Sequence, residues 1–362
     1  MPPRVTVIWL NYNSSRFIGV VLRSLESVLS VDYPPDMLEL VVVDNASTDG
    51  SFESVRGYLE AHRGGARVKV VRAGSNLGFT GGSNLGFAAR DRDSRYVLLL
   101  NNDAVIYPDG LRALVDYLEE HPRVAAVQGV VLKLGTRLID TAGDYVDEML
   151  VSHPFGVEKA YPWILRHPVY VSYADGSCSL YRVEHVLKCV GERLFVGEFF
   201  AYGDDNVLGL ELWGCGHPSV ALEKAVAEHY RSATLGSKRT RRLLAEYYDA
   251  RNGVALARVS NSRLRGVAPV YRLVKAGLLF LRYKDRLVLR TVADGLRLAR
   301  LLEARGMVID VHRAPVIPLT AKAVLGSFAP FARASLLRKY IDEWVARNYD
   351  GVLDAREEPA TS

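Results

Sequence analysis

The stretch RYVLLLNNDAVIYPDG, residues 95–110, joins a buried-strand pattern to an abrupt polar cluster. Residues 96–100 are all apolar or aromatic, which is typical of a strand covered on both faces. Asn101, Asn102 and Asp103 follow at once. A carboxylate at the carboxyl edge of a sheet is a good oxygen ligand for Mg²⁺ or Mn²⁺, whereas a lone Asp after a strand more often forms a cap or turn. The stretch therefore predicts a central strand and leaves two roles open for Asp103.

Three more strand patterns in the first hundred residues end in the same way. Strand and helix patterns alternate in the order 4–10, 15–30, 38–44, 51–63, 66–73, 82–90 and 95–101. This alternation predicts an α/β fold with a mostly parallel sheet flanked by helices. Ligands bind beyond the carboxyl ends of the strands in such sheets. Four polar clusters are expected to meet there, namely NYNSS, DNASTDGS, GSNLGFTGGSN and NND.

Each early cluster also has a structural interpretation. Asp49 and Ser51 suit a turn and a helix cap. Asp44 follows three valines directly, and a charge at that place is expected to bind something, such as the N–H donor of a pyrimidine ring. The glycines of residues 74–87 allow either a close approach to a ligand or only a tight turn, and no Gly-Lys-Ser/Thr sequence follows to make a phosphate loop of the Walker type.

Two later features carry chemistry of their own. Asp204 and Asp205 are adjacent carboxylates after an aromatic run, which suits either a general base or the acidic start of a helix. His229 lies in the sequence VAEHYRSAT, where a lone histidine is a metal ligand or an ordinary core residue.

Composition narrows the class of protein. The chain has 362 residues, of which 49% are hydrophobic and 24% charged, as in ordinary globular proteins. Its three cysteines show no metal spacing and fit a reducing compartment. The N-terminal residues read as a first strand and not as a signal peptide, and no apolar run approaches the roughly 18 residues that span a bilayer. A cytoplasmic location is therefore expected.

The charge is unevenly distributed. The net charge is +5, yet residues 231–300 hold 17 Lys or Arg against 4 acidic residues, a local balance of +13. We expect a domain boundary near residue 232, with a catalytic unit at 1–232 and a basic, mainly helical region at 233–362. The apolar and basic mixture within residues 238–306 favours either contact with an anionic membrane or a solvated basic helical face. No nucleic-acid motif accompanies the charge, so a nucleic-acid partner is not expected.

Together these motifs resemble the inverting glycosyltransferases of family 2, particularly their non-processive rhamnosyltransferase-like and galactofuranosyltransferase-like branch. The resemblance covers residues 4–255 and rests on seven stretches in family order: NYN (11–13), VVVDNASTDGS (41–51), NLGFTGGSN (76–84), LLLNNDAVIYPDGL (98–111), FFAYGDD (199–205), GHPSVALEKAVAEHYRSAT (216–234) and YYDARN (247–252). It implies a nucleotide-binding sheet domain of the GT-A type, an Mg²⁺ or Mn²⁺ cofactor, a UDP- or dTDP-linked sugar donor, and a glycan or lipid-linked acceptor.

The resemblance also implies roles for particular residues. Donor binding would fall to Asn11, Tyr12, Asn13, Asp44, Asn45, Asn76, Gly78, Asn102 and Asp103. Asp103 matches the last acid of the D-x-D metal motif, whose first acid is replaced by Asn101, and His229 matches a late histidine that helps to hold the metal or the diphosphate. Asp205 matches the catalytic base, with Asp204 beside it. The role of the R-N pair at 251–252 stays open.

Two departures from the family pattern shape the alternatives. Asp204 stands where a Glu is usual, and Val207 stands where a further acid is often found. These changes keep open a catalytically silent member that binds a sugar nucleotide or acts as a scaffold in glycan assembly. The only glutamine is Gln128, so the Q-x-x-R-W motif of processive synthases is missing. A nucleotidyltransferase is disfavoured because the basic N-terminal pyrophosphate loop of that class is also missing.

Overall fold

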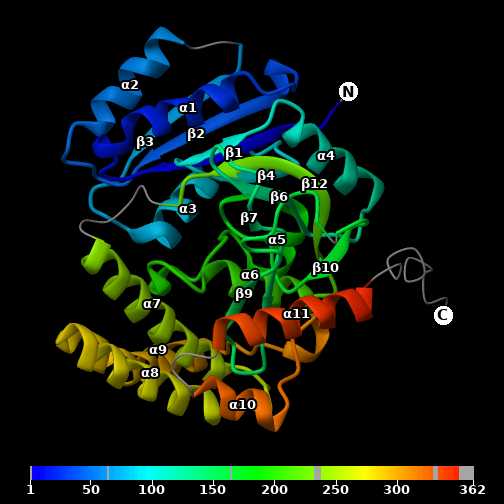
Figure 1. The fold of residues 1–362 in the computed structure, drawn as a ribbon. Coiled ribbons are helices and arrows are strands. Elements are labelled where there is room, and N and C mark those ends of the chain that lie inside the picture. The colour runs from blue at the N-terminus through cyan, green and yellow to red at the C-terminus, as the bar shows by residue number, and fades with distance from the viewer. Residues whose placement is uncertain (1, 63–64, 164, 232–237, 329–332, 350–362) are drawn as a thin grey trace.

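The computed structural model describes residues 2–62, 65–163, 165–231, 238–328 and 333–349, and Figure 1 shows its course. A twisted sheet forms the upper and central part of the molecule, and helices of the C-terminal region gather below it. The main sheet has the strand order β10-β12-β6-β11-β4-β1-β2-β3. The α/β class, the flanking helices and the helical C-terminal region are all confirmed.

The first half of the sheet is parallel, as the alternating pattern predicts. It consists of β1 (Val5–Asn11), β2 (Leu38–Asp44), β3 (Arg67–Arg72) and β4 (Tyr96–Asn101). β1 pairs in parallel with both β2 and β4, and β2 pairs in parallel with β3. The strand ends are in register, because Asn11 lies opposite Asp44 and Leu10 lies opposite Asn101. The polar clusters therefore leave the sheet along one edge.

The second half of the sheet mixes strand directions. It consists of β5 (Ala104–Ile106), β6 (Ala126–Lys133), β7 (Ile139–Thr141), β10 (Val169–Val171), β11 (Cys178–Arg182) and β12 (Ser219–His229). β11 runs antiparallel to β4 and β6, whereas β12 runs parallel to β6. A separate two-stranded sheet joins β8 (Asp144–Val146) to β9 (Ser152–Pro154).

Helices cover both faces of the sheet. They are α1 (Ile18–Leu29), α2 (Ser51–Ala61), α3 (Gly78–Ala89), α4 (Gly110–Glu120), α5 (Val183–Val190) and α6 (Asp204–Gly214). Val7 and Trp9 of β1 pack into one core with α1, α2 and α4, whereas Ile8 packs into the opposite core with α3, α5 and α6. This alternation explains why the central strands are apolar at every position.

The glycine-rich stretch forms most of a helix rather than an extended loop. α3 begins at Gly78, four residues before the helix expected at 82–90. A Cβ on Gly82 would lie 2.5 Å from a methyl of Leu10, and one on Gly86 would lie 2.5 Å from a methyl of Ile8. The glycines therefore let α3 pack directly on β1.

The C-terminal helices share their core with the sheet region. They are α7 (Lys238–Val259), α8 (Val267–Tyr283), α9 (Thr291–Ala304), α10 (Ala321–Ser327) and α11 (Arg333–Tyr349). Short 3-10 turns lie at Ser15–Phe17, Pro35–Met37, Gly197–Phe199, Arg286–Arg290 and Val311–Arg313. One apolar cluster joins α7 and α9 to residues near the start of α6, and another joins α11 to β6 and β10. Whether residues 1–232 form a unit of their own stays a prediction.

Among the described residues, no helix is both long enough and apolar enough to cross a bilayer.

Candidate functional site

A cavity of about 550 Å³ opens at the carboxyl edge of the parallel strands. Its wall is completed by the segment before α6 and by the end of β12. The lining contains nine of the predicted site residues: Tyr12, Asn45, Asn76, Gly78, Asn102, Asp103, Asp204, Asp205 and His229. Side chains that are more than 200 positions apart in the sequence are thus brought together.

Three other predicted residues do not line this cavity. Asn11 and Asp44 are buried below it, where the Asn11 amide donates to Asp44 Oδ1 over 3.0 Å. The carboxylate of Asp44 also accepts from the Ser47 backbone N–H and forms an ion pair with Arg72. Asn13 accepts from the Thr48 backbone N–H. The contacts of Asp44 hold the ends of neighbouring strands together, and a nucleotide role for these three residues stays a prediction.

Asn45, which directly follows β2, holds the loop between β3 and α3. Its amide donates to Asn76 Oδ1 and to the carbonyl of Gly78, each over 3.0 Å, and its Oδ1 accepts from the Leu77 backbone N–H. Gly78 has a φ of +71°, and a Cβ there would lie 2.2 Å from the carbonyl oxygen of Phe200. Only glycine fits at this approach.

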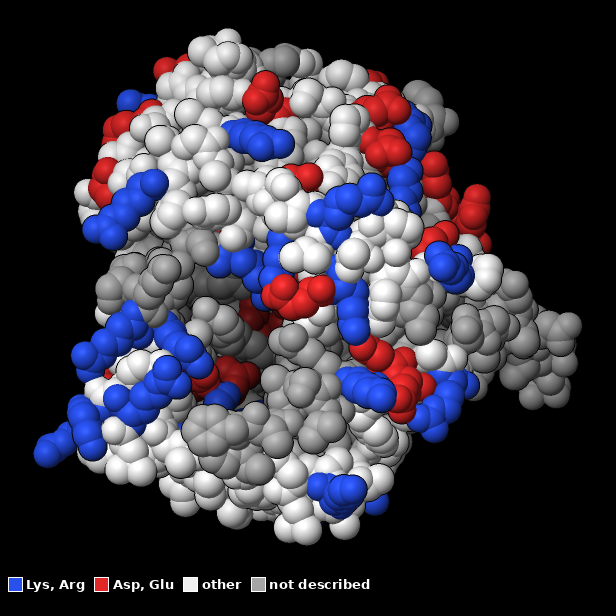
Figure 2. Space-filling model, viewed as in Figure 1, with Lys and Arg blue, Asp and Glu red and all other residues white. Residues whose placement is uncertain are grey.

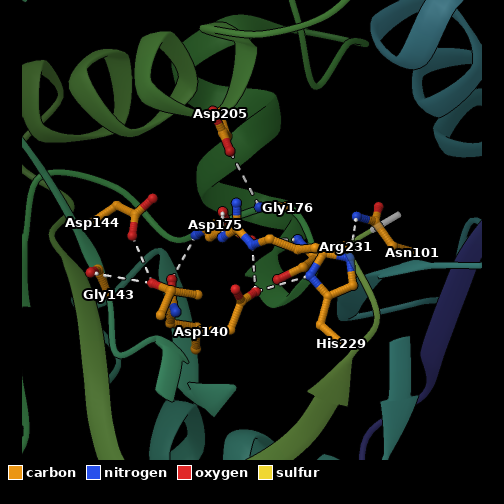
Figure 3. A network of polar contacts seen from close by, with 12 residues as sticks. Asn101, Asp140, Gly143, Asp144, Asp175, Gly176, Asp205, His229 and Arg231 are labelled. Atoms are coloured by element: carbon orange, nitrogen blue, oxygen red, sulfur yellow. Dashed lines mark hydrogen bonds and ion pairs between the residues drawn. The ribbon is translucent and has the colours of Figure 1, made fainter. Parts of the chain in front are cut away.

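Asp103 and His229 are in direct contact and both line the cavity, and Figure 3 shows the surroundings of His229. His229 Nε2 lies 3.0 Å from Asp103 Oδ1, and His229 Nδ1 lies 3.0 Å from Asp140 Oδ2 on β7. Asn101 adds a weaker contact of 3.5 Å to His229 Nε2. Burial lowers the pKa of His229, but its hydrogen bonds to Asp103 and Asp140 outweigh burial and raise the pKa to about 9.

The donor set suits a divalent cation that is held partly by the substrate. Asp103 supplies a carboxylate oxygen, and His229 supplies an imidazole nitrogen once a metal displaces its proton; both residues line the cavity. Among the described residues, no group of three His, Cys, Asp or Glu side chains is arranged to hold a metal ion. Mg²⁺ and Mn²⁺ are commonly bound by one or two protein ligands together with substrate phosphates and waters. The residues therefore fit a metal that is shared with a diphosphate.

The adjacent acids begin helix α6 on the opposite wall. Asp205 Oδ2 accepts from the Gly176 backbone N–H over 3.3 Å, and Oδ1 accepts from the Asn206 N–H over 2.9 Å. Burial and then the nearby carboxylates, chiefly Asp204, raise the pKa of Asp205 well above its usual value. Burial likewise raises the pKa of Asp204 to about 7. A carboxylate whose pKa is raised in this way is a stronger base than an exposed carboxylate, which suits general base chemistry.

The R-N pair of α7 holds the loop that precedes these acids. Asn252 Nδ2 donates to the carbonyls of Phe199, Ala201 and Tyr202, and Arg251 donates to those of Glu198 and Phe199. The loop needs this support because Phe200, Tyr202 and Gly203 all have positive φ. The hydrogen bonds of Arg251 and Asn252 thus hold the backbone that leads to Asp204 and Asp205, which gives this pair a structural role.

Several functional candidates were missed by sequence reasoning. Asp144, Tyr173, Asp175, Gly176 and Arg231 line the cavity, and Asp140 lies buried behind it. Asp144 accepts from Thr141 Oγ1 over 2.6 Å and from the Tyr173 hydroxyl over 3.0 Å, and burial raises its pKa to about 7. In the sequence, Arg231 lies within the quoted stretch 216–234, two residues after His229. Asp175 and Gly176 lie in the turn-forming Ala-Asp-Gly-Ser at 174–177, a sequence that is common in ordinary loops.

Comparison with protein families gives a match to the model of Glycosyl transferase family 2 over residues 6–185, about half of the chain. Among curated proteins, the chain is 30% identical over 118 residues to the poly(ribitol-phosphate) beta-N-acetylglucosaminyltransferase TarS of Staphylococcus aureus. That alignment covers 33% of this chain and 19% of the relative. The chain thus matches about a fifth of the length of the curated relatives.

Solved structures share the fold at low sequence identity. A mannosyltransferase from Pyrobaculum calidifontis, solved with GDP-Man and Mn²⁺, has a TM-score of 0.53 at 21% identity, over 96% of this chain and 85% of that one. GalNAc-T7, solved with UDP, GalNAc and Mn²⁺, has a TM-score of 0.57 at 13% identity, over 85% of this chain and 56% of that one. TarS residues 1–349 of S. aureus, solved with UDP-GlcNAc, have a TM-score of 0.51 at 14% identity, over 95% and 92%.

Proposed function

Since this chain belongs to glycosyl transferase family 2, we propose that it is an inverting, non-processive glycosyltransferase. The donor would be a UDP- or dTDP-linked sugar, and the acceptor a hydroxyl of a glycan or of a lipid-linked saccharide. The structures with similar folds were solved with nucleotide-sugar donors or with a nucleotide and a sugar, and two of them with Mn²⁺. A role in the biosynthesis of cell-envelope polysaccharide belongs to the same proposal.

The observation that supports this proposal is the separation of Asp205 from His229 within one cavity, as Figure 3 shows. Asp103 is in contact with His229. Single-displacement inversion requires this separation, because the acceptor hydroxyl must attack the anomeric carbon from the side opposite the leaving diphosphate.

Different residues of the chain would bind the donor, accept the proton and hold the metal. Asn45, Asn76 and Gly78 shape the wall for the nucleoside and the sugar, with Tyr12 beside them. Asp205 accepts the proton of the acceptor hydroxyl while its carboxylate is held by two backbone N–H groups. Asp103 and His229 would hold the divalent cation. A cation bound there would neutralise negative charge on the leaving nucleoside diphosphate.

Nucleotide binding and turnover of purified variants test this proposal together. We expect Asp205→Asn to lower turnover about 10²- to 10⁴-fold while nucleoside diphosphate binding persists. Asp103→Ala should weaken Mn²⁺-dependent binding of the nucleoside diphosphate. Asp32→Asn is a matched control, because Asp32 is exposed and pairs only with Arg112 on the surface among the described residues. Full turnover in both site variants would refute the assignment. Binding of a nucleoside diphosphate and Mn²⁺ without turnover of any donor would instead favour the silent, scaffolding alternative.

We also propose that the protein is a cytoplasmic enzyme in peripheral contact with the inner face of the membrane. The outer face of α8 carries an apolar stripe at helical spacing, in which the side chains are 41–62% exposed: Val270, Leu273, Val274, Leu278 and Leu281. Lys and Arg side chains gather over the region of α7 to α9 on the face shown in Figure 2. Arg282, Lys284 and Arg286 follow the stripe in sequence. An apolar stripe next to basic residues suits an anionic bilayer surface. Self-association through the same face would bring like charges together.

A further inference from the structure

Arg231 is the only Lys or Arg among the described residues that line the cavity. Six carboxylates line the same cavity: Asp103, Asp144, Asp175, Asp204, Asp205 and Asp249. A nucleoside diphosphate adds at least two more negative charges to this wall. The cavity therefore needs positive charge wherever the diphosphate lies, and Arg231 supplies the one guanidinium in the lining.

Two acidic side chains hold one edge of this guanidinium (Figure 3). Arg231 Nε donates to Asp140 Oδ2 over 2.6 Å, and Nη2 lies 3.8 Å from Asp175 Oδ2, which is too long for a hydrogen bond. Within the described chain, the Nη groups make no hydrogen bond. The side chain of Asp140 is 2% exposed, whereas that of Arg231 is 45% exposed. The buried acid thus anchors Arg231, and the Nη donors stay accessible in the cavity.

The same acid places Arg231 next to the candidate metal ligands. Asp140 Oδ2 also bonds His229 Nδ1, so the imidazole and the guanidinium share a single carboxylate oxygen. The intervening Tyr230 donates its backbone N–H to the carbonyl of Asp103 over 2.9 Å. Arg231 has a φ of +49°, which is unfavourable for a residue with a side chain. These contacts fix the place of Arg231 relative to Asp103.

We propose that Arg231 binds the phosphoryl oxygens of the donor diphosphate directly, and that Asp140 is the positioning residue that holds it. This inference rests on the proposed function, because its ligand is the donor of that reaction. When the bond between the anomeric carbon and the diphosphate oxygen breaks, the electron pair moves to that oxygen, and Arg231 stabilises the charge while it stays protonated. A planar fork of donors suits phosphate better than a point charge does. The contact needs no metal.

An ion-pair role alone does not explain the geometry. Neutralising Asp140 requires only the Nε edge, and a purely structural arginine would bury its Nη groups against carbonyls. Arg272 of α8 does this in the same molecule, since its two Nη groups donate to the carbonyls of Met149 and Leu150 and the residue is 2% exposed. Arg231 instead presents its Nη donors to the cavity.

Isothermal titration calorimetry of wild type and variants tests this proposal. It measures the binding of UDP and dTDP, and of uridine and thymidine, in the presence of EDTA. We expect Arg231→Gln to weaken diphosphate binding at least about tenfold, as the loss of a charge-assisted hydrogen bond predicts, and to leave nucleoside binding unchanged. Arg231→Lys keeps the charge but not the planar fork of donors, so its affinity for the diphosphates should lie between those of wild type and Arg231→Gln. Arg112→Gln is the matched control, because Arg112 is an exposed arginine that pairs with Asp32 away from the cavity.

Four outcomes would count against the inference. If wild type and Arg231→Gln bind UDP and dTDP equally without metal, Arg231 does not contact the diphosphate, and the proposed function is unaffected. Binding by wild type that occurs only with Mn²⁺ refutes a metal-independent contact. If wild type binds no nucleoside diphosphate even with Mn²⁺, the proposed function fails together with the inference. Thermal unfolding of each variant shows whether a loss reflects misfolding, and an Arg231→Lys protein that folds but binds no better than Arg231→Gln also counts against the fork.

Discussion

Replacing Asp204 by Asn should change the pH dependence of stability in a predictable direction. The carboxyl group of Asp204 is buried, and its Oδ2 has no hydrogen-bond partner among the described residues. Burial raises its pKa from 3.8 to about 7. The folded protein therefore binds a proton that the unfolded chain releases. This contribution to stability is fully present below pH 4 and is lost as the pH rises through 7.

The size of the effect follows from the difference in pKa. A shift from 3.8 to about 7 corresponds to about 4 kcal/mol at 1.36 kcal/mol per pKa unit. Asp205 shares the same buried environment and competes for the proton, so this figure is an upper bound for Asp204 alone. We expect the free energies of unfolding of Asp204→Asn and wild type to differ by no more than about 1 kcal/mol near pH 4.5, and the variant to be more stable by about 2–4 kcal/mol at pH 8.

Urea titrations followed by circular dichroism at pH 4.5, 6 and 8 measure this difference. Asp49→Asn provides a control of opposite sign. Burial acts upward on the pKa of Asp49, but hydrogen bonds from Ser51 and Ser15 outweigh it and lower the pKa to about 2. Asp49→Asn should therefore be less stable than wild type at pH 7, and the deficit should shrink as the pH falls towards 2. A stability difference for Asp204→Asn that is the same at pH 4.5 and pH 8 would refute a proton held by this pair.

Three further changes test other parts of the site and surface. Asn252→Ala removes the donor for three loop carbonyls, so we expect lower turnover and a lower melting temperature, and unchanged turnover would show that the loop holds its shape without α7. Asp140→Asn should weaken Mn²⁺ binding in the presence of UDP about 10- to 100-fold, measured by electron paramagnetic resonance of free Mn²⁺; undiminished binding would contradict a supporting role for Asp140. The double variant Leu273→Glu with Leu281→Glu should no longer sediment with vesicles of phosphatidylglycerol and phosphatidylcholine. The matched double variant Val308→Glu with Leu325→Glu changes residues that are exposed outside the α8 stripe, and it should still sediment. Equal loss of sedimentation in both double variants would show that α8 is not the membrane contact.

The parallel half of the site could be predicted because strand ends converge there by geometry. Once the alternation of strands and helices is recognised, residues that follow different strands must meet at one edge. Which of them face the cavity depends on a shift of a single residue. Asn11 and Asp44 are the last residues of paired strands and lie buried, whereas Tyr12 and Asn45, one position later, line the cavity. Sequence patterns do not locate a strand end to within one residue, and that precision decides the face.

The other half of the site depends on long-range pairings that leave weak local signals. Asp140 lies on the three-residue strand β7, and Asp175 and Gly176 lie in a turn before β11. The buried side chain of Gln128, the only glutamine in the chain, accepts from the Asp175 backbone N–H over 2.6 Å. It thereby fixes the turn whose Gly176 N–H reaches Asp205. These residues have ordinary loop composition, and only their pairing across β6, β11 and β12 gives them a place in the site.

The contacts of α7 link the two regions that composition separates near residue 232. Arg251 and Asn252 belong to the basic C-terminal region by sequence, yet their donors satisfy the backbone of residues 198–202. Positive φ angles in that loop are unfavourable for Phe200 and Tyr202, and persist only where surrounding contacts compensate. The orientation of Asp204 and Asp205 at the start of α6 therefore depends on a helix that begins at Lys238. The hydrogen bonds that support the candidate site therefore extend past the change in charge near residue 232, at least to Asn252.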